Sequence, residues 1–309
     1  MSEQFCDVGR GITLCYETFG DRDRPPLLLI MGLGTQMIGW HEDFCAQLAE
    51  RGFHVVRFDN RDVGRSTHCR GRPPRLHQIV ARRFDRGQYT LTDLADDAAR
   101  LIGRLDLAPA HVVGASMGGM IAQTLAAERP ESVRSLTSIM SNTGHRLKGQ
   151  PALGAYRHIL KRAPRDRDGY IEHMTRVFSL IGSPGLPTDL DEVRDVVARH
   201  YDRDRSRADT GRQLAAILAS GNRTERLTSV TVPTVVIHGS GDRLVRPSGG
   251  KATAEAIPDA ELEMIEGMGH DLPRAAWPRI LDAIAQNAAR ADGEGGIESV
   301  AGDARAVGG

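Results

Sequence analysis

The sequence predicts an α/β fold, with a mostly parallel sheet of eight strands flanked by helices. Short apolar runs alternate three times with amphipathic helical stretches before residue 140, which is the pattern of βαβ units. The same alternation resumes after residue 225, whereas residues 144–225 show helical spacing without a convincing buried strand. A chain of 309 residues fits one α/β domain that carries a helical insertion.

The first strands are predicted from short runs bounded by turn residues. Residues 5–8 and 13–19 carry apolar and β-branched side chains on either side of Gly-Arg-Gly, so we expect a hairpin at the sheet edge. Residues 27–31 form a continuous apolar run, which is typical of a strand buried on both faces. Residues 54–58 form a similar short strand, and a helix from about 40 to 51 connects the two.

The next elements lead to the middle of the sheet. Residues 67–88 are basic and weakly patterned, and we expect a loop that contains at most a short helix. Over residues 90–105, apolar side chains recur on one helical face, and Thr90 with Asp93 can cap the start of this helix. An apolar strand at residues 111–115 is expected after this helix.

The remaining elements continue the alternation around the insertion. A strand is expected at residues 133–140, before the insertion, and another at residues 232–238, after it. A helix at residues 248–257, a strand at residues 261–265 and a final helix at residues 275–289 complete the pattern.

This pattern predicts three parts of the chain. Residues 1–143 and 226–290 form the core domain. Residues 144–225 form a helical cap, inserted after the sixth strand and lying across the carboxyl ends of the strands. Residues 291–309 are rich in Gly, Ala, Asp and Glu and lack aromatic residues, so we expect a disordered tail.

Composition argues against several kinds of partner. Lys plus Arg and Asp plus Glu number 40 each, and the formal net charge of zero favours neither a nucleic acid nor an anionic membrane. No stretch approaches the roughly 18 apolar residues of a membrane span, and no basic region precedes an apolar run at the start. We expect a cytoplasmic protein with a small-molecule substrate. A homodimer is compatible with the sequence, which does not fix the oligomeric state.

Neither a metal nor a cofactor is expected. Cys6, Cys15, Cys45 and Cys69 lack Cys-x-x-Cys spacing and suit reduced, buried thiols. The histidines show no mutual spacing that a metal site would need.

Residues 114–118 read Gly-Ala-Ser-Met-Gly, between an apolar strand and a helical pattern. A serine hydroxyl becomes a useful nucleophile only where a base takes its proton and backbone donors meet the developing oxyanion. A sharp strand-to-helix turn lifts the hydroxyl above the sheet and places unpaired helix N–H groups beside it. The glycines on either side give such a turn the room it needs. Ser116 is therefore the candidate nucleophile.

Two further candidates follow later strands. Asp242 comes after the strand at residues 232–238, and His270 comes after the strand at residues 261–265. Because the carboxyl ends of parallel strands meet at one edge of the sheet, these side chains are expected near Ser116. His270 would take the Ser116 proton and return it to the leaving group, while Asp242 would hold the imidazole in the required tautomer.

An oxyanion hole needs two donors. We expect the backbone N–H of Met117, the residue after the nucleophile, to be one of them. The second is expected from the loop after residues 27–31, where glycines at 32 and 34 would let Leu33 turn its N–H inward.

The chain resembles the α/β-hydrolase superfamily over roughly residues 5–290, with Ser116, Asp242 and His270 at the triad positions. Residues 29–34 with Trp40, residues 58–67, residues 116–118 and residues 267–270 are similar to bacterial carboxylesterases related to the aclacinomycin methylesterases.

This resemblance implies an α/β-hydrolase fold and ester hydrolysis through an acyl-serine. Where many members have His-Gly, this chain has Met31-Gly32, and the backbone role of that loop does not depend on the replaced side chain. Asp59 and Arg61 match the superfamily loop Asp-x-Arg-Gly-x-Gly-x-Ser, although Asp62 stands where glycine is usual. A structural polar network is favoured over catalysis for Asp59 and Arg61.

Methionines gather near the predicted strand ends and the serine, which suggests a deformable apolar pocket for bulky or varied substrates. The residues expected to line the substrate pocket are Met31, Gly32, Met37, Trp40, Met120, Met140 and Met268.

The same triad supports other reactions. A thioesterase, a lactonase, a carbon-carbon bond hydrolase and a cofactor-free perhydrolase all remain alternatives, because a fold does not choose among them. A non-catalytic ligand-binding protein is the alternative from another class.

Overall fold

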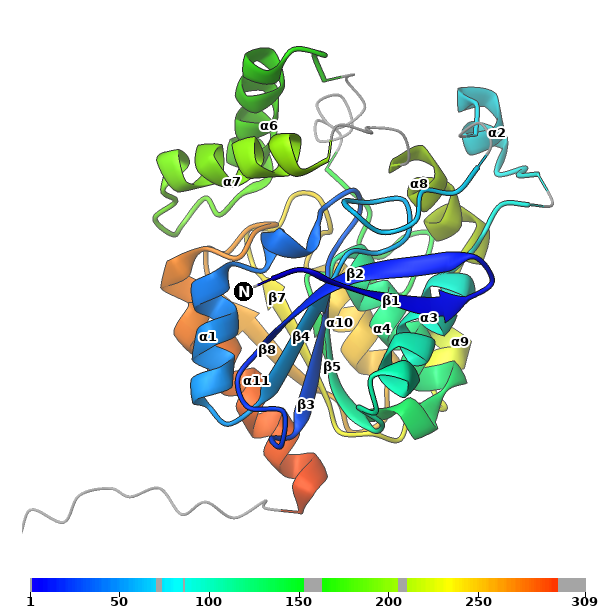
Figure 1. The fold of residues 1–309 in the computed structure, drawn as a ribbon, viewed down its shortest axis with the longest axis vertical. Coiled ribbons are helices and arrows are strands. Elements are labelled where there is room, and N and C mark those ends of the chain that lie inside the picture. The colour runs from blue at the N-terminus through cyan, green and yellow to red at the C-terminus, as the bar shows by residue number, and fades with distance from the viewer. Residues whose placement is uncertain (1, 71–73, 86, 153–162, 205–209, 294–309) are drawn as a thin grey trace, which may run out of the picture.

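The computed structural model describes the chain except for residues 1, 71–73, 86, 153–162, 205–209 and 294–309. The predicted tail from residue 294 onward therefore lies outside the described residues. In the described part, a single eight-stranded sheet forms the centre and helices cover both of its faces (Figure 1).

The sheet has the order β1-β2-β4-β3-β5-β6-β7-β8. β2 pairs antiparallel with both β1 and β4, and all the other neighbouring strands are parallel. The hairpin of β1 and β2 thus forms one edge, as predicted, and the parallel part has its strands buried as expected of a sheet covered on both faces. The strands are β1 Gln4–Gly9, β2 Ile12–Phe19, β3 Pro26–Ile30, β4 His54–Phe58, β5 Ala110–Ala115, β6 Val133–Ile139, β7 Thr234–Gly239 and β8 Glu261–Ile265.

Two helix layers bury the apolar faces of the sheet (Figure 1). One layer contains α1 (Glu42–Glu50) and α11 (Trp277–Asp292), and the other contains α3 (Leu91–Arg104), α4 (Met117–Glu128), α9 (Thr224–Leu227) and α10 (Ser248–Ala256). The predicted cap of α3 is present, because the Thr90 N–H donates to Asp93 Oδ2 over 2.8 Å. The shorter elements are η1 Met37–Gly39, α2 Leu76–Ala81, η2 Pro130–Ser132 and η3 Arg274–Ala276.

Most boundaries lie within a few residues of the predicted ones. α1 begins two residues later than the pattern indicates, because η1 precedes it and His41 caps it by accepting from the Asp43 N–H. The final helix runs on to Asp292, past the predicted end at residue 289, and Gly293 ends it in the left-handed region.

The helical insertion after β6 lies at the end of the molecule where the parallel strands end (Figure 1). Its described helices are α6 (Arg167–Ile181), α7 (Leu190–Arg203) and α8 (Thr210–Ser220). None of the helices in the described part of the chain has the length and apolar composition needed to cross a membrane.

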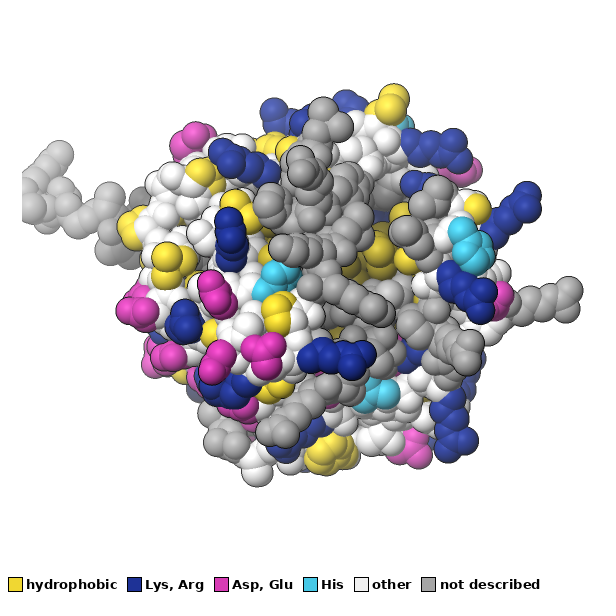
Figure 2. All heavy atoms as spheres, turned by 90° about the horizontal axis from the view of Figure 1, so that it is seen from above, with side chains coloured by type: hydrophobic (Ala, Val, Ile, Leu, Met, Phe, Trp, Pro, Cys, Tyr) yellow, Lys and Arg dark blue, Asp and Glu magenta, His cyan; other side chains and the backbone are white. Residues whose placement is uncertain are grey.

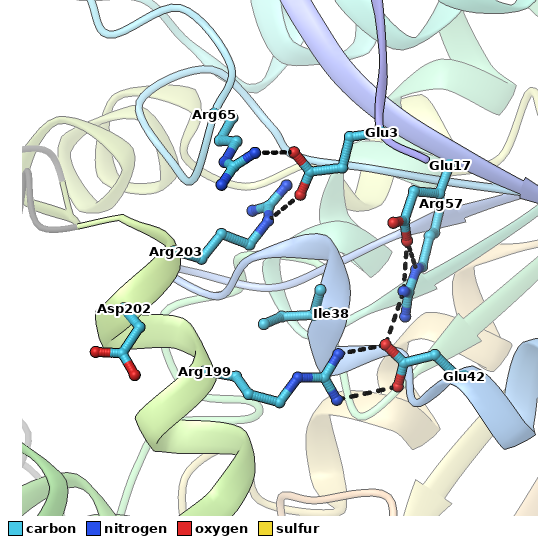
Figure 3. A pocket seen from close by; sticks show the side chains of 9 residues that line it. All are labelled: Glu3, Glu17, Ile38, Glu42, Arg57, Arg65, Arg199, Asp202 and Arg203. Carbon is cyan, nitrogen blue, oxygen red and sulfur yellow. Dashed lines mark hydrogen bonds and ion pairs between the residues drawn. The ribbon is translucent and has the colours of Figure 1, made fainter. Parts of the chain in front are cut away.

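Ion pairs connect α7 to the core around a polar cavity of about 360 Å³ (Figure 3). Arg203 pairs with Asp59 at 2.7 Å and with Glu3 at 2.7 Å, and Arg199 donates to both carboxylate oxygens of Glu42. Arg57, which is buried, also donates to Glu42, over 3.1 Å. The insertion is therefore attached to the core through charged side chains in this region.

Replacing Glu42 by glutamine is expected to destabilise the protein at neutral pH and to matter less in acid. Burial alone would raise the pKa of Glu42, but hydrogen bonds from Arg199 and Arg57 outweigh it and lower the pKa from 4.5 to about 2. A carboxyl with a lowered pKa stabilises the fold above its unfolded-state pKa, and the stabilisation is lost as the pH falls through the folded-state value. Since the side chain is 37% exposed and water screens the pairs, we expect about 1 kcal/mol or less at pH 7.

Urea unfolding of the wild type and the Glu42→Gln variant, at pH 7 and at steps down to pH 3, measures this effect. Glu50→Gln on the same helix is the matched control, because Glu50 is exposed and makes no ion pair within the described residues. A stability difference that stays constant from pH 7 to pH 3 would contradict the ion-pair explanation.

Candidate active site

Ser116 occupies a sharp turn between β5 and α4. Its φ of 55° and ψ of −116° are a conformation that a non-glycine residue rarely adopts, at a cost of about 1–3 kcal/mol. The turn is held by the Ser116 N–H, which donates to the Ile139 carbonyl over 2.9 Å, and by the Ser141 hydroxyl, which donates to the Ser116 carbonyl over 2.8 Å. The Ser116 side chain is thereby presented at the end of the sheet and is partly exposed.

The two glycines of the motif are required sterically. A Cβ on Gly114 would collide with the carbonyl of Gly118, and a Cβ on Gly118 would collide with the carbonyl of Ile30. The turn therefore brings the start of α4 against both β5 and the end of β3, as the spacing of the motif predicts.

The structure brings His270 and Asp242 together with Ser116. The Ser116 hydroxyl lies 2.9 Å from His270 Nε2, and His270 Nδ1 lies 2.8 Å from Asp242 Oδ2. The three side chains come from the ends of β5, β7 and β8, which is where the sequence predicts them. Both His270 and Asp242 are buried, so these hydrogen bonds are shielded from water.

Asp242 is held as a carboxylate. Burial alone would raise its pKa, but the contacts with His270 and His238 outweigh burial and keep the pKa well below its usual range. Its second oxygen, Oδ1, accepts from the N–H groups of Leu244 and Val245, each over 2.8 Å. The carboxylate is thus fixed by backbone donors on one side and faces the imidazole on the other.

The two predicted oxyanion donors come from the residue after the serine and from the loop after β3. Met117 is the first residue of α4, and a Cβ on Gly32 would lie 3.2 Å from Ser116 Cβ and 3.7 Å from Ser116 Oγ. Among the residues that the structure describes, no acceptor takes the N–H of Leu33 or Met117. The next N–H of the loop, that of Gly34, is occupied, because it donates to Gln213 Oε1 over 2.8 Å. Both predicted donors are thus without a hydrogen-bond partner within the described residues, and their approach to an oxyanion stays a prediction.

The predicted pocket residues fall into different parts of the core. Met31, Trp40, Met140 and Met268 pack in one cluster, and Met120 packs on the opposite face of the sheet. Met37 is in a separate small cluster with Cys15 and Ile38. Of these seven residues, Gly32 approaches the Ser116 side chain closely. Contact of these seven residues with a substrate stays a prediction.

His238 is a contact of the site that sequence reasoning missed. It is fully buried, and its Nε2 lies 2.7 Å from the Val245 carbonyl and 3.4 Å from Asp242 Oδ2. Since both neighbours are acceptors, this nitrogen carries a proton, and Asp242 therefore contacts two histidines. The sequence shows that His238 lies four residues before Asp242, but the local pattern does not indicate the direction in which its ring points.

The loop after β4 forms a buried polar network of the kind predicted for Asp59 and Arg61. Asp59 is fully buried, and its Oδ1 accepts from the Met37 N–H over 2.7 Å. Arg61 donates to both oxygens of Asp97 over 2.5 and 2.6 Å, and Asp62 accepts from Arg212 over 2.8 Å. In the described ranges, no group of three His, Cys, Asp or Glu side chains converges in the way a metal site needs.

Comparison with known proteins agrees with the fold. The family model described as the alpha/beta hydrolase fold matches residues 25–273. Rhodomycin D methylesterase DnrP of Streptomyces peucetius is 28% identical over 294 residues, which cover 88% of this chain and 94% of that protein. 3-Oxoadipate enol-lactonase 2 of Acinetobacter baylyi is 25% identical over 84% of this chain and 87% of its own length.

A solved structure shows the same fold. A hydrolase from Pseudomonas aeruginosa PA01 superimposes with a TM-score of 0.68 at 20% identity, covering 94% of this chain and 98% of that chain. The family match confirms the predicted fold, and the similarity to a methylesterase confirms the closer resemblance that the motifs indicate.

Proposed function

Because the chain belongs to the alpha/beta hydrolase family, we propose that it is a serine hydrolase that cleaves carboxylic esters through an acyl-serine intermediate. The observation that carries this proposal is the chain of two hydrogen bonds from the Ser116 hydroxyl through His270 to Asp242, at 2.9 and 2.8 Å. These distances are those at which an imidazole can accept the proton of a nucleophile.

The reaction follows from these positions. His270 Nε2 takes the proton as the Ser116 oxygen attacks the ester carbonyl, and the N–H groups of Leu33 and Met117 donate to the resulting oxyanion. His270 then gives the proton to the leaving alkoxide, and an acyl-serine remains. A water molecule, activated by His270 in the same way, releases the acid and restores the serine.

We propose apolar or bulky esters as the substrates. Figure 2 looks onto the end of the molecule where the insertion lies, and hydrophobic side chains gather in a recess of this face. Met31, Met140 and Met268 pack in one cluster, and we propose that they line the pocket and offer flexible, polarisable contacts to such groups. The similarity to a rhodomycin D methylesterase supports a methyl ester as one substrate to try, with rhodomycin D itself as the first. A strict preference for short charged esters would contradict this assignment.

The insertion is proposed to cap this site. Residues 144–225 would form a helical cap on a core made of residues 1–143 and 226–290. The position of α6 and α7 at the end of the sheet that carries Ser116 supports this division (Figure 1).

Labelling with a fluorophosphonate, followed by a panel of aryl esters of increasing acyl length, tests the proposal. We expect one covalent adduct by intact mass and turnover of the esters. Absence of both labelling and turnover would favour a non-catalytic binding protein. Labelling with turnover of ring-cleavage dienoates alone would favour a carbon-carbon bond hydrolase. Turnover of lactones, thioesters or peracids in preference to esters would favour the corresponding alternative on the same triad.

Substituting Gly32 by valine is expected to lower kcat for a good ester about a hundred- to a thousand-fold. The added Cβ would lie 3.2 Å from both the Ala115 carbonyl oxygen and Ser116 Cβ. The branched side chain would therefore push the loop away from the serine and withdraw the Leu33 donor.

Steady-state kinetics of the Gly32→Val variant measures this loss. Gly103→Val on α3 is a matched control, because a Cβ added there meets nothing within 4 Å. An unchanged kcat in the Gly32→Val variant would mean that the second oxyanion donor comes from another part of the chain.

A further inference from the structure

The loop that carries His270 is held by a segment of the insertion. Residues 181–185, which we call the strap, begin at the last residue of α6 and lie against residues 267–271. The His270 N–H donates to the Ile181 carbonyl over 2.8 Å, and the Gly185 N–H donates to the Gly267 carbonyl over 3.0 Å. The backbone of His270 is therefore bonded to the insertion.

Ser183 makes two more hydrogen bonds across the same contact. Its hydroxyl accepts from the Gly269 N–H over 2.9 Å and donates to Asp271 Oδ1 over 2.5 Å. These partners are the residues immediately before and after His270. One side chain of the strap thus holds both neighbours of the imidazole-bearing residue.

The strap packs backbone against backbone, which leaves little freedom in its position. A Cβ on Gly269 would collide with the Gly182 carbonyl, and a Cβ on Gly267 would lie 2.9 Å from the Gly185 Cα. On the side of Asp242, a Cβ on Gly241 would lie 2.7 Å from Pro184 Cγ. The contact therefore reaches the loops that carry both His270 and Asp242.

We propose that the strap positions His270 for proton transfer, with Ser183 as the positioning residue. This inference rests on the proposed function of Ser116, Asp242 and His270. His270 lies beyond β8, outside any helix or strand, so sheet hydrogen bonds do not hold its backbone. The strap supplies the missing partners, and a shift of the insertion would change the distances from the imidazole to Ser116 and to Asp242.

A purely structural role for the strap makes a different prediction. If these contacts only attach the insertion, their loss would lower stability or raise KM and leave the proton-transfer step unaffected. If they position His270, their loss lowers kcat, because a displacement of about 1 Å can cost roughly a hundred-fold in rate.

The test compares Ser183→Ala with Ser183→Thr, which keeps the hydroxyl, and with Ser179→Ala on α6. Ser179 is exposed, lies about one turn before Ser183 and makes no hydrogen bond to residues 267–271 in the described structure. We expect Ser183→Ala to lower kcat for an aryl ester about ten- to a hundred-fold, with KM within about threefold of the wild type. Ser183→Thr should recover most of the loss, and Ser179→Ala should match the wild type.

The Asp271→Ala variant removes the other partner of the Ser183 hydroxyl, and it serves as the test if Ser183→Ala fails to fold, with a loss of kcat and a KM near the wild-type value expected. Where both variants fold, a double-mutant cycle sharpens the result. Because the two side chains share one hydrogen bond, the double variant should lose about as much kcat as Ser183→Ala alone. Losses that simply add would overturn the claim that they act as one unit.

Two outcomes separate this inference from the proposed function. A wild-type protein that neither reacts with a fluorophosphonate nor hydrolyses esters would contradict the proposed function itself. A wild type that does both, together with a Ser183→Ala variant whose kcat stays within about twofold, would overturn the role of the strap alone. An equal loss of kcat in the Ser179→Ala variant would also overturn the role of the strap.

Discussion

Replacing Ser116 by alanine is expected to lower kcat for an aryl ester roughly a million-fold and to abolish labelling by a fluorophosphonate. The alanine has no hydroxyl to attack the carbonyl, and His270 then has no proton to accept. The fold should be retained, because the turn is held by the backbone of Ser116 through Ile139 and Ser141. Intact mass after labelling and single-turnover kinetics together measure the effect.

The Ser179→Ala variant is the control for labelling. Ser179 is exposed on α6 and makes no hydrogen bond to Ser116, Asp242 or His270 within the described residues. Its variant should still form the adduct. Residual turnover above about 1% of wild type in Ser116→Ala would place the nucleophile on another residue.

Replacing Asp242 by asparagine is expected to lower kcat about ten-thousand-fold with little change in KM. The wild-type carboxylate accepts from His270 Nδ1, which leaves Nε2 free to accept the serine proton. An asparagine can turn its amide N–H toward Nδ1 and thus favour the opposite tautomer, in which Nε2 carries the proton. The Leu244 and Val245 N–H groups would still be satisfied by the amide oxygen, so the loop should keep its conformation.

Kinetics of Asp242→Asn, with circular dichroism as the check on folding, measures this prediction. Asp282→Asn is a matched control, since Asp282 is 59% exposed on α11 and pairs only with Arg51 in the described structure. If Asp242→Asn retained a tenth or more of the wild-type kcat, another group would have to orient His270.

Local sequence patterns were sufficient to predict the strands of the sheet and the sharp turn at Ser116. Continuous apolar runs identify strands that are buried on both faces, and β3, β4 and β5 lie within one or two residues of the predicted positions. The Gly-x-Ser-x-Gly spacing is required sterically, because a Cβ on Gly114 or on Gly118 would collide with neighbouring backbone. The carboxyl ends of parallel strands meet at one edge of the sheet, and this rule was sufficient to predict that Asp242 and His270 lie near Ser116.

The contacts of His238 and Ser183 had no such local signal. His238 is one histidine in an apolar strand, and its direction depends on where Val245 and Asp242 lie after folding. Ser183 lies in the insertion, almost ninety residues before its partners, and a single serine in a loop carries no motif.

The sequence by itself determined the order of strands and helices along the chain, the sharp turn at Ser116 and the placement of Ser116, Asp242 and His270 after strand ends. Each of these follows from residues that are neighbours in the chain or from the direction of the strands. Only the tertiary structure decided which parts of the insertion contact the core, through Arg199 and Arg203 on α7 and through residues 181–185 beside His270. Such contacts join segments far apart in the sequence, and their partners are set by how the helices pack rather than by any local pattern.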